Sequence, residues 1–189
     1  MAALSGSGLR ESLRLAAVVL GVLAVIHPAF SGEDLERSVK AAFISKFSGY
    51  VEWPASAAPA ADAALVIGVV GDEGLADELK RLIRARPADA RPMSVVRLKA
   101  FDAPPALHVL FIGHSEADRL GALIRSVRGR PVLVVTDTED ALALGSMINF
   151  DLVDGHVRFQ VGLGAARKAG LTLSSRLLAV AHQVMTRTP

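Results

Sequence analysis

One pentapeptide, Gly113-His114-Ser115-Glu116-Ala117, comes closest to a catalytic motif in this sequence. It stands between a strand-like run and a helix-like run, which is the setting of the G-x-S-x-G nucleophile elbow of hydrolases. Ala117 replaces the second glycine, whose missing side chain relieves crowding in that strained turn. A serine hydrolase that uses Ser115 is therefore one hypothesis, and the alternative is that Ser115 caps the helix that follows.

A serine nucleophile also requires an acid and then a histidine farther along a chain of this type. Asp137 followed by His156 or His182 has the required order, but no spacing singles these residues out. Because Ser is a common helix N-cap and the motif is incomplete, the sequence favours a structural role for Ser115.

The sequence contains no clear motif for a phosphate-binding loop or a metal site. Gly71-Asp72-Glu73-Gly74 follows a strand-like run, but it lacks both G-x-G-x-x-G and the Lys-Ser/Thr pair of a P-loop. The five His residues include no close pair at helical spacing, and the chain has no Cys, which excludes the usual structural zinc sites. We therefore expect no catalytic residue, no metal and no cofactor.

The first 31 residues resemble a secretory signal peptide. Arg10 and Arg14 precede an unbroken apolar run over residues 15–26, and the small residues Ala29 and Ser31 follow. That run is short for a membrane-spanning helix, which needs about 20 apolar residues. We expect a signal peptide over 1–31 and one domain over 32–189, with an uncleaved signal anchor as the alternative. Without Cys, a lipid-anchored lipoprotein is excluded.

Charge and composition argue against nucleic-acid binding. The formal net charge is only +2, and aromatic residues make up 5% of the chain. A protein that binds nucleic acid usually carries a basic patch, and single strands are usually stacked on aromatic side chains. The predicted partners are therefore not nucleic acids.

The hydrophobic pattern predicts an α/β fold. Residues 35–47 form a helical stripe of Leu35, Val39, Phe43 and Phe47, which leaves Lys40 and Lys46 off the stripe and in solvent. Strand-like runs over 65–70, 94–98, 108–112 and 132–136 alternate with helical runs, and Pro104-Pro105 breaks the chain before the third of them. Asp137 or Thr138 is expected to cap a short helix through Leu144, and Ser174 or Ser175 a final helix that carries His182. The fold class is a single-domain, mixed but mostly parallel sheet flanked by helices.

An antiparallel hairpin near the C-terminus is the most sharply defined element. Asp154-Gly155 lies between two alternating runs, and Asp-Gly favours a type I′ turn. This turn pairs Val153 with His156 and fixes the register of the rest. The face with Ile148, Phe150, Leu152, Val157, Phe159 and Val161 is expected to pack on the core. The other face, which includes Asn149, Asp151, Arg158 and Gln160, is expected to meet water or a partner.

Two groups of residues are candidates for partner binding. The first is Glu52 and Trp53 at the end of the first helix, because Trp is enriched at interfaces, with a role of Trp53 in anchoring the helix in the core as the alternative. The second is the polar hairpin face of Asn149, Asp151, Arg158 and Gln160. An ordinary surface ion pair between Asp151 and Arg158 on a solvated face is the alternative for the second group.

Three blocks of the sequence together resemble the YfiR family of periplasmic proteins. They are 40–47 (KAAFISKF) with 51–54 (VEWP), 108–112 (HVLFI), and 129–133 (GRPVL) leading to 147–150 (MINF), the Asp-Gly hairpin and 165–171 (AARKAGL). The resemblance implies an α/β domain, export to the periplasm, and a regulatory rather than enzymatic role.

The resemblance also implies particular partners. In the family, the protein represses an inner-membrane diguanylate cyclase by binding its periplasmic region, which lowers cyclic-di-GMP and biofilm formation. An outer-membrane OmpA-like lipoprotein can sequester it. A homodimer is left open, and redox control through disulfides cannot operate here because Cys is absent. A periplasmic small-molecule binding module, with its ligand near the carboxyl ends of the strands, is the main alternative function.

Overall fold

The computed structural model describes residues 32–60, 62–99 and 106–186. The signal peptide predicted over 1–31 and the break at Pro104-Pro105 lie outside these ranges. None of the helices within them combines the length and the apolar character that are needed to span a bilayer.

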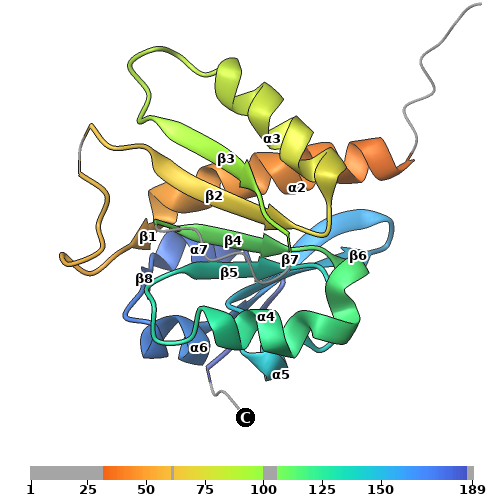
Figure 1. Ribbon diagram of the computed structural model, residues 1–189. Helices are drawn as coiled ribbons and strands as arrows, with labels where there is room; N and C mark the ends of the chain where they lie inside the picture. The colour runs from red at the N-terminus through yellow and green to blue at the C-terminus, as the bar shows by residue number, and fades with distance from the viewer. Residues whose placement is uncertain (1–31, 61, 100–105, 187–189) are drawn as a thin grey trace, which may run out of the picture. The chain divides into compact units, whose positions relative to one another are not determined.

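A seven-stranded sheet in the order β3-β2-β4-β5-β6-β7-β9 forms the centre of the domain (Figure 1). The five strands from β3 to β6 are parallel, β6 and β7 form the antiparallel hairpin, and β9 pairs parallel to β7. The mostly parallel α/β sheet with a C-terminal hairpin is therefore confirmed. The strands are β2 (Leu65–Val70), β3 (Met93–Arg97), β4 (Val109–Ile112), β5 (Leu133–Thr136), β6 (Ile148–Val153), β7 (His156–Gly162) and β9 (Gln183–Met185).

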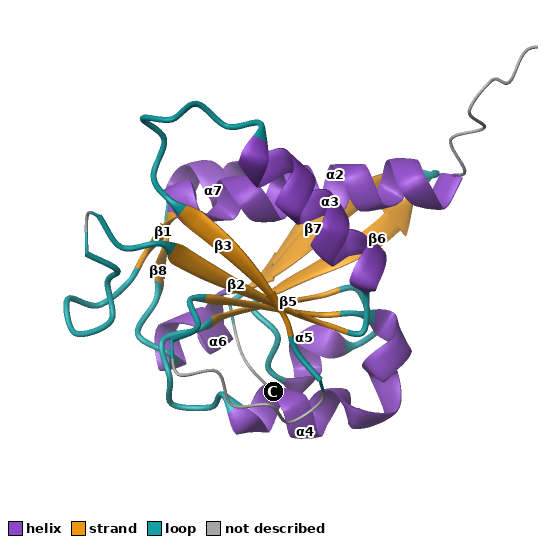
Figure 2. Ribbon diagram, turned by 45° about the horizontal axis from the view of Figure 1, so that its top comes forward, coloured by secondary structure: helices purple, strands orange, loops and turns teal. Residues whose placement is uncertain are grey.

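Helices cover both faces of the sheet, as its apolar strands require. One face carries α2 (Gly32–Phe47) and α3 (Glu73–Arg84), and the other carries α4 (Leu120–Ser126), α5 (Ala141–Leu144) and α6 (Leu163–Lys168) (Figure 2). Shorter elements are the 3-10 helices η1 (Ser48–Tyr50) and η2 (His114–Arg119), the helix α7 (Ser175–Val180), and a two-stranded ribbon of β1 (Val51–Glu52) with β8 (Thr172–Leu173).

The hairpin has the predicted register. Val153 pairs with His156, Phe150 with Phe159 and Ile148 with Val161. Asp154 and Gly155 have φ values of 51° and 72°, as a type I′ turn requires. On the core side, both Phe150 and Phe159 pack against the aromatic rings of α2: Phe159 meets Phe43 and Phe47 edge-on, with ring centroids 5.4 Å apart in each case.

The apolar face of the hairpin extends beyond the core. Leu152 belongs to that face by alternation, but its residue surface is 59% exposed. Leu35, on the same stripe of α2 as Phe43, is 62% exposed. The aromatic cluster therefore anchors the base of the hairpin. The tip of the hairpin, residues 151–158 around the turn, presents apolar as well as polar side chains.

Several predicted helix boundaries were wrong. Neither Asp137 nor Thr138 caps α5, whose N-cap is Asp140 in the left-handed region with φ 57°. The final helix is capped by Ser174, as one prediction had it, but it ends at Val180. His182 then begins an extended segment, where its backbone N–H donates to the carbonyl of Phe159, and strand β9 follows. This segment pairs parallel to β7, with Gln183, Val184 and Met185 opposite Gln160, Val161 and Gly162.

Replacing Gly155 with Ala tests the hairpin turn. No heavy atom lies within 4 Å of the Cβ that Ala would add, so the cost comes only from the positive φ. We expect G155A to lower the free energy of unfolding by about 1–2 kcal/mol in urea denaturation. Gly49 has similarly open surroundings without a positive φ, so G49A should change stability by less than about 0.5 kcal/mol. Equal effects of the two substitutions would contradict the turn assignment.

Candidate functional site

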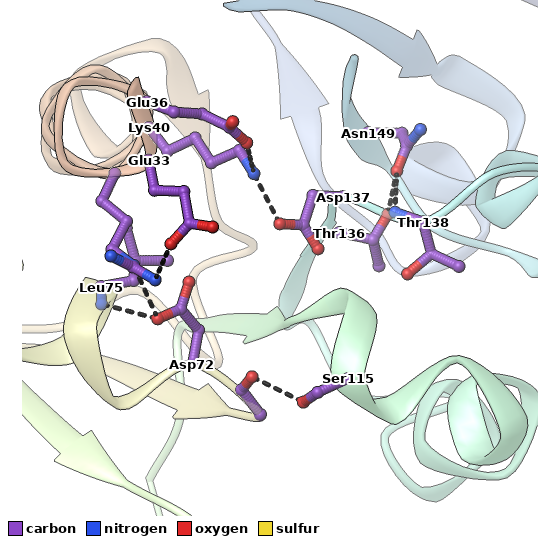
Figure 3. A network of polar contacts seen from close by, with 12 residues as sticks. Glu33, Glu36, Lys40, Asp72, Leu75, Ser115, Thr136, Asp137, Thr138 and Asn149 are labelled. Atoms are coloured by element: carbon purple, nitrogen blue, oxygen red, sulfur yellow. Dashed lines mark hydrogen bonds and ion pairs between the residues drawn. The ribbon is translucent and has the colours of Figure 1, made fainter. Parts of the chain in front are cut away.

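A buried ion pair links the first helix to the centre of the sheet. Lys40, which the helical stripe placed in solvent, is only 8% exposed. Its Nζ lies 2.6 Å from Oδ2 of Asp137, directly after β5, and 2.5 Å from Oε1 of Glu36, one turn earlier on α2. Figure 3 shows the three side chains converging. The prediction of a solvated Lys40 was wrong because a hydrophobic stripe indicates only which residues pack in the core. It does not reveal a charged partner that is 97 residues away in the sequence.

The electrostatics of this group favour its charged form. Burial alone would lower the pKa of Lys40, but the charges and hydrogen bonds of Asp137 and Glu36 outweigh burial and raise that pKa above its ordinary value. The other carboxylate oxygen of Asp137, Oδ1, is buried and has no hydrogen-bond partner among the described residues. Asp137 therefore depends on Lys40 for its compensation.

A second polar network lies beside the first and uses Asn149. The Thr136 hydroxyl donates to Oδ1 of Asn149 over 2.7 Å, and the backbone N–H of Thr138 donates to the same oxygen over 3.2 Å. The Ser146 hydroxyl lies 2.8 Å from that of Thr136. Asn149 is only 3% exposed, so it does not lie on a surface that meets water or a partner, contrary to expectation. Its hydrogen bonds instead link β6 to the carboxyl end of β5 (Figure 3).

Ser115 closes the gap between the carboxyl ends of β2 and β4. Its hydroxyl donates to the carbonyl of Gly71 over 2.6 Å (Figure 3). A Cβ at Gly113 would lie 2.7 Å from that same carbonyl oxygen. The loop after β2 and the loop after β4 can therefore approach this closely only because residue 113 is a glycine. In open α/β sheets this switch point between strands is where ligands commonly bind. Here direct contact between the loops occupies it.

The residues nominated for a serine hydrolase do not meet. Ser115 lies in a 3-10 helix whose N-cap is Gly113, so it is not the predicted helix cap. Asp137 holds Lys40, and Nδ1 of His156 lies 2.8 Å from the carbonyl of Asp154 in the hairpin turn. The structure gives the hydrolase hypothesis no support, because Ser115, Asp137 and His156 each have a different partner.

The polar face of the hairpin carries an unpaired arginine. Asp151 and Arg158 are opposite one another in the register, but neither has an ion-pair partner among the described residues. Arg158 is exposed, whereas Asp151 and Gln160 are partly buried. These last two and Asn149 line a hollow of about 330 Å³ with Glu139, Asp140 and Met185. No group of three possible metal ligands occurs in the described ranges.

Strand β1, which contains Glu52 and directly precedes Trp53, lies at the opposite end of the domain from the β6–β7 turn (Figures 1 and 2). Glu52 is exposed and pairs with Thr172 in the β1–β8 ribbon. Trp53 is partly buried against the core, with its ring edge-on to His108 at a centroid distance of 6.2 Å. The structure therefore keeps the two predicted groups of partner-binding residues apart.

These features define an α/β domain built on a mostly parallel sheet. The polar groups at the carboxyl ends of the strands bond to one another, and Arg158 is exposed on the hairpin. The family model described as YfiR/HmsC-like matches residues 37–182, so the chain belongs to the YfiR/HmsC-like family, whose members are periplasmic and generally non-enzymatic regulators. No curated protein matches the chain.

Sequence reasoning missed the Lys40–Asp137 pair, although a signal for it was present. Glu36 and Lys40 have the i, i+4 spacing of a helical ion pair, which places an acid beside the lysine. Asp137 directly follows a four-residue strand whose residues are all buried, so its backbone position is fixed by buried neighbours. What the sequence lacks is any indication that α2 would cross the end of that particular strand.

Replacing Lys40 with Met tests the buried pair. K40M leaves the Asp137 carboxylate uncompensated, and we expect a loss of about 3 kcal/mol in the free energy of unfolding. The double variant K40M/D137N should recover much of that loss. The exposed Lys46 of the same helix provides the control, because K46M should change stability by less than about 0.5 kcal/mol. Similar losses for K40M and K46M would contradict the assignment.

The same pair predicts a pH dependence. Because the pKa of Lys40 is raised in the folded state, its contribution to stability is complete below the ordinary value of 10.5 and decreases as the pH rises through the raised pKa. The difference in unfolding free energy between wild type and K40M should therefore be constant from pH 7 to 10 and decrease above pH 10.5. A difference that remains constant at higher pH would count against the charged pair.

His108 predicts a loss of stability in acid. Its Nδ1 accepts a hydrogen bond from the backbone N–H of Val66 at 3.1 Å, which requires the neutral ring. Burial lowers the pKa of His108, and the charge of Arg91 lowers it further, so stability should decrease as the pH falls below 6.5. H108N keeps an acceptor but cannot titrate. Urea unfolding at pH 7.5 and 5.0 should show a larger loss for wild type than for H108N.

Proposed function

We propose that this chain is an exported periplasmic repressor. It binds the periplasmic region of an inner-membrane diguanylate cyclase, holds the enzyme inactive, and so lowers cyclic-di-GMP and biofilm formation. The observation that carries the proposal is the YfiR/HmsC-like family match over residues 37–182. An outer-membrane OmpA-like lipoprotein is the proposed second partner, which would release the cyclase by sequestering the repressor.

Export rests on the first 31 residues. Basic residues, an apolar run and small residues follow one another there in the order of a signal peptide. The family match begins at Arg37, so the segment 1–31 lies wholly outside the matched region. We propose that residues 1–31 direct export and that residues 32–189 form the periplasmic domain.

The tip of the hairpin is the proposed contact with the cyclase. Arg158 is exposed and has no ion-pair partner among the described residues, and Leu152, on the other hairpin face, is 59% exposed. Arginine is enriched among interface hot spots, where it pairs with acidic or aromatic groups of a partner. Asp151 and Gln160 flank Arg158 on the same face, and Asn149 contributes by fixing the base of the hairpin rather than by contact.

The contacts that hold the base of the hairpin in place favour its use as a binding surface. Its base is held on one side by the phenylalanines of α2 and on the other by the Thr136–Asn149 network. A surface that is already ordered before binding loses less conformational entropy on association. Repression then needs no bond chemistry, only a higher affinity for the inactive than for the active state of the cyclase.

The β1 end of the domain is the proposed second contact. Glu52 is exposed there and can meet a basic group of a partner, whereas Trp53 packs on His108 and positions the ribbon. Because this end is separate from the hairpin turn, the cyclase and the lipoprotein could each use one end of the domain.

Replacing Arg158 with Glu tests the repressor function. Deletion of the gene should raise cyclic-di-GMP and biofilm formation in the organism that encodes it, and wild-type protein should restore both. We expect R158E to bind the periplasmic region of the cyclase at least tenfold more weakly, which corresponds to about 1.4 kcal/mol, and to fail to restore repression. R125E is the control, because Arg125 is an exposed arginine of α4, on the other face of the sheet from α2.

Three outcomes would decide the matter. Unchanged cyclic-di-GMP in the deletion strain would refute repression altogether. Equal binding by wild type and R158E, with repression retained, would move the contact away from the hairpin, and E52R then tests the β1 end. Equal impairment of R158E and R125E would show that neither substitution reports a specific contact.

A further inference from the structure

A cavity of about 420 Å³ lies among the helices of the face opposite α2 and α3. Its floor is Val134 of β5 and Met147, which directly precedes β6, and its walls come from α4, α5 and α6. Most of the lining is apolar: Ile124, Val127, Val134, Ala143, Leu144, Met147, Ala165 and Ala169. Ligand pockets in proteins typically measure about 300–1,000 Å³ and are mainly apolar, so the cavity is of the right size and character.

The polar side chains at the mouth are both cationic. Arg128, after α4, and Lys168, at the end of α6, line the cavity and are exposed, and neither has an ion-pair partner among the described residues. The lining includes no Asp or Glu. Two cations from different elements at one apolar opening create a positive potential that an anionic group would satisfy.

The walls of this cavity are fixed by the fold. Gly145 ends α5 with φ 110°, and a Cβ there would lie 3.3 Å from Ile124, so α5 and α4 are already in close contact. The backbone N–H of Met147 donates to the carbonyl of Val134 over 3.0 Å, which fixes the floor. Binding here therefore requires little rearrangement, which favours affinity.

We propose that this cavity binds a small anionic amphiphile, an apolar chain or ring that carries one carboxylate or phosphate group. The apolar part occupies the space over Val134 and Met147, and the anionic group meets Arg128 and Lys168 at the mouth. The proposal does not depend on the repressor function, since none of the lining residues belongs to the hairpin tip or to the β1 end. It also differs from a ligand at the switch point of the sheet, which Ser115 and Gly71 occupy.

Calorimetric titration of the purified protein with matched amphiphiles tests the proposal. Decanoate and decyl phosphate supply the two anionic groups, and decyltrimethylammonium supplies the same chain with the opposite charge, all below their micellar concentrations. We expect one saturable site for at least one anion and at least tenfold weaker binding of the cation. Raising the salt concentration should weaken binding of the anion, because the two cations are exposed.

Charge-reversal variants locate the site. K168E and R128E should each weaken binding of the anion at least fivefold, whereas R167E, which changes the exposed neighbour of Lys168 outside the cavity, should leave it unchanged. All three substitutions are at exposed positions, so folding can be verified by an unchanged unfolding midpoint. A165L, which fills the apolar part, should abolish binding if it folds, and the rim variants decide the matter if it does not.

Several results would overturn the proposal. They are the absence of saturable binding by both anions, equal affinity for the anions and decyltrimethylammonium, and equal effects of K168E and R167E. If no amphiphile binds but K168E weakens association with the cyclase, the cavity is a protein contact and not a ligand site.

Discussion

The pairing of Lys40 with Asp137 is the constraint on which the arrangement of the domain depends. It joins the first helix to the end of a central strand across 97 residues, and Lys40 is the ion-pair partner of the Asp137 carboxylate, whose Oδ1 has no hydrogen-bond partner among the described residues. A buried cation and a buried carboxylate are each costly without the other, so the pair favours the position of α2 that brings them together. That position in turn places Phe43 and Phe47 under the hairpin.

The hairpin is consequently held from both sides. The phenylalanines of α2 pack on its apolar face, and Asn149 on its other face receives hydrogen bonds from Thr136 and Thr138, the neighbours of Asp137. The ion pair and the amide network therefore lie on consecutive residues of one short segment after β5. Arg158 and Leu152, both exposed on the hairpin, lie outside this network.

Local sequence signals predicted local structure well. The Asp154-Gly155 turn defined six residue pairs because the side-chain period of a strand is two and a turn of two residues allows one register. Alternation could not predict that Asn149 is buried, because the strand pattern says which side a residue faces and not what covers that side. The burial of Lys40 and the strand β9 were missed for a related reason. Neither a charged partner 97 residues away nor an edge strand of three residues produces a periodic hydrophobic pattern in the sequence.

The same short strands connect the two faces of the sheet. Val134 and Met147 form the floor of the cavity under α4, α5 and α6, and Thr136 and Asn149 lie two residues farther along β5 and β6 in the network that holds the hairpin. A ligand in the cavity would change the affinity of the hairpin for a partner only if it bound two arrangements of these strands with different free energies. By linkage, the partner would then change the affinity for the ligand by the same factor. The separation of only two residues makes β5 and β6 the shortest covalent path between the cavity and the hairpin.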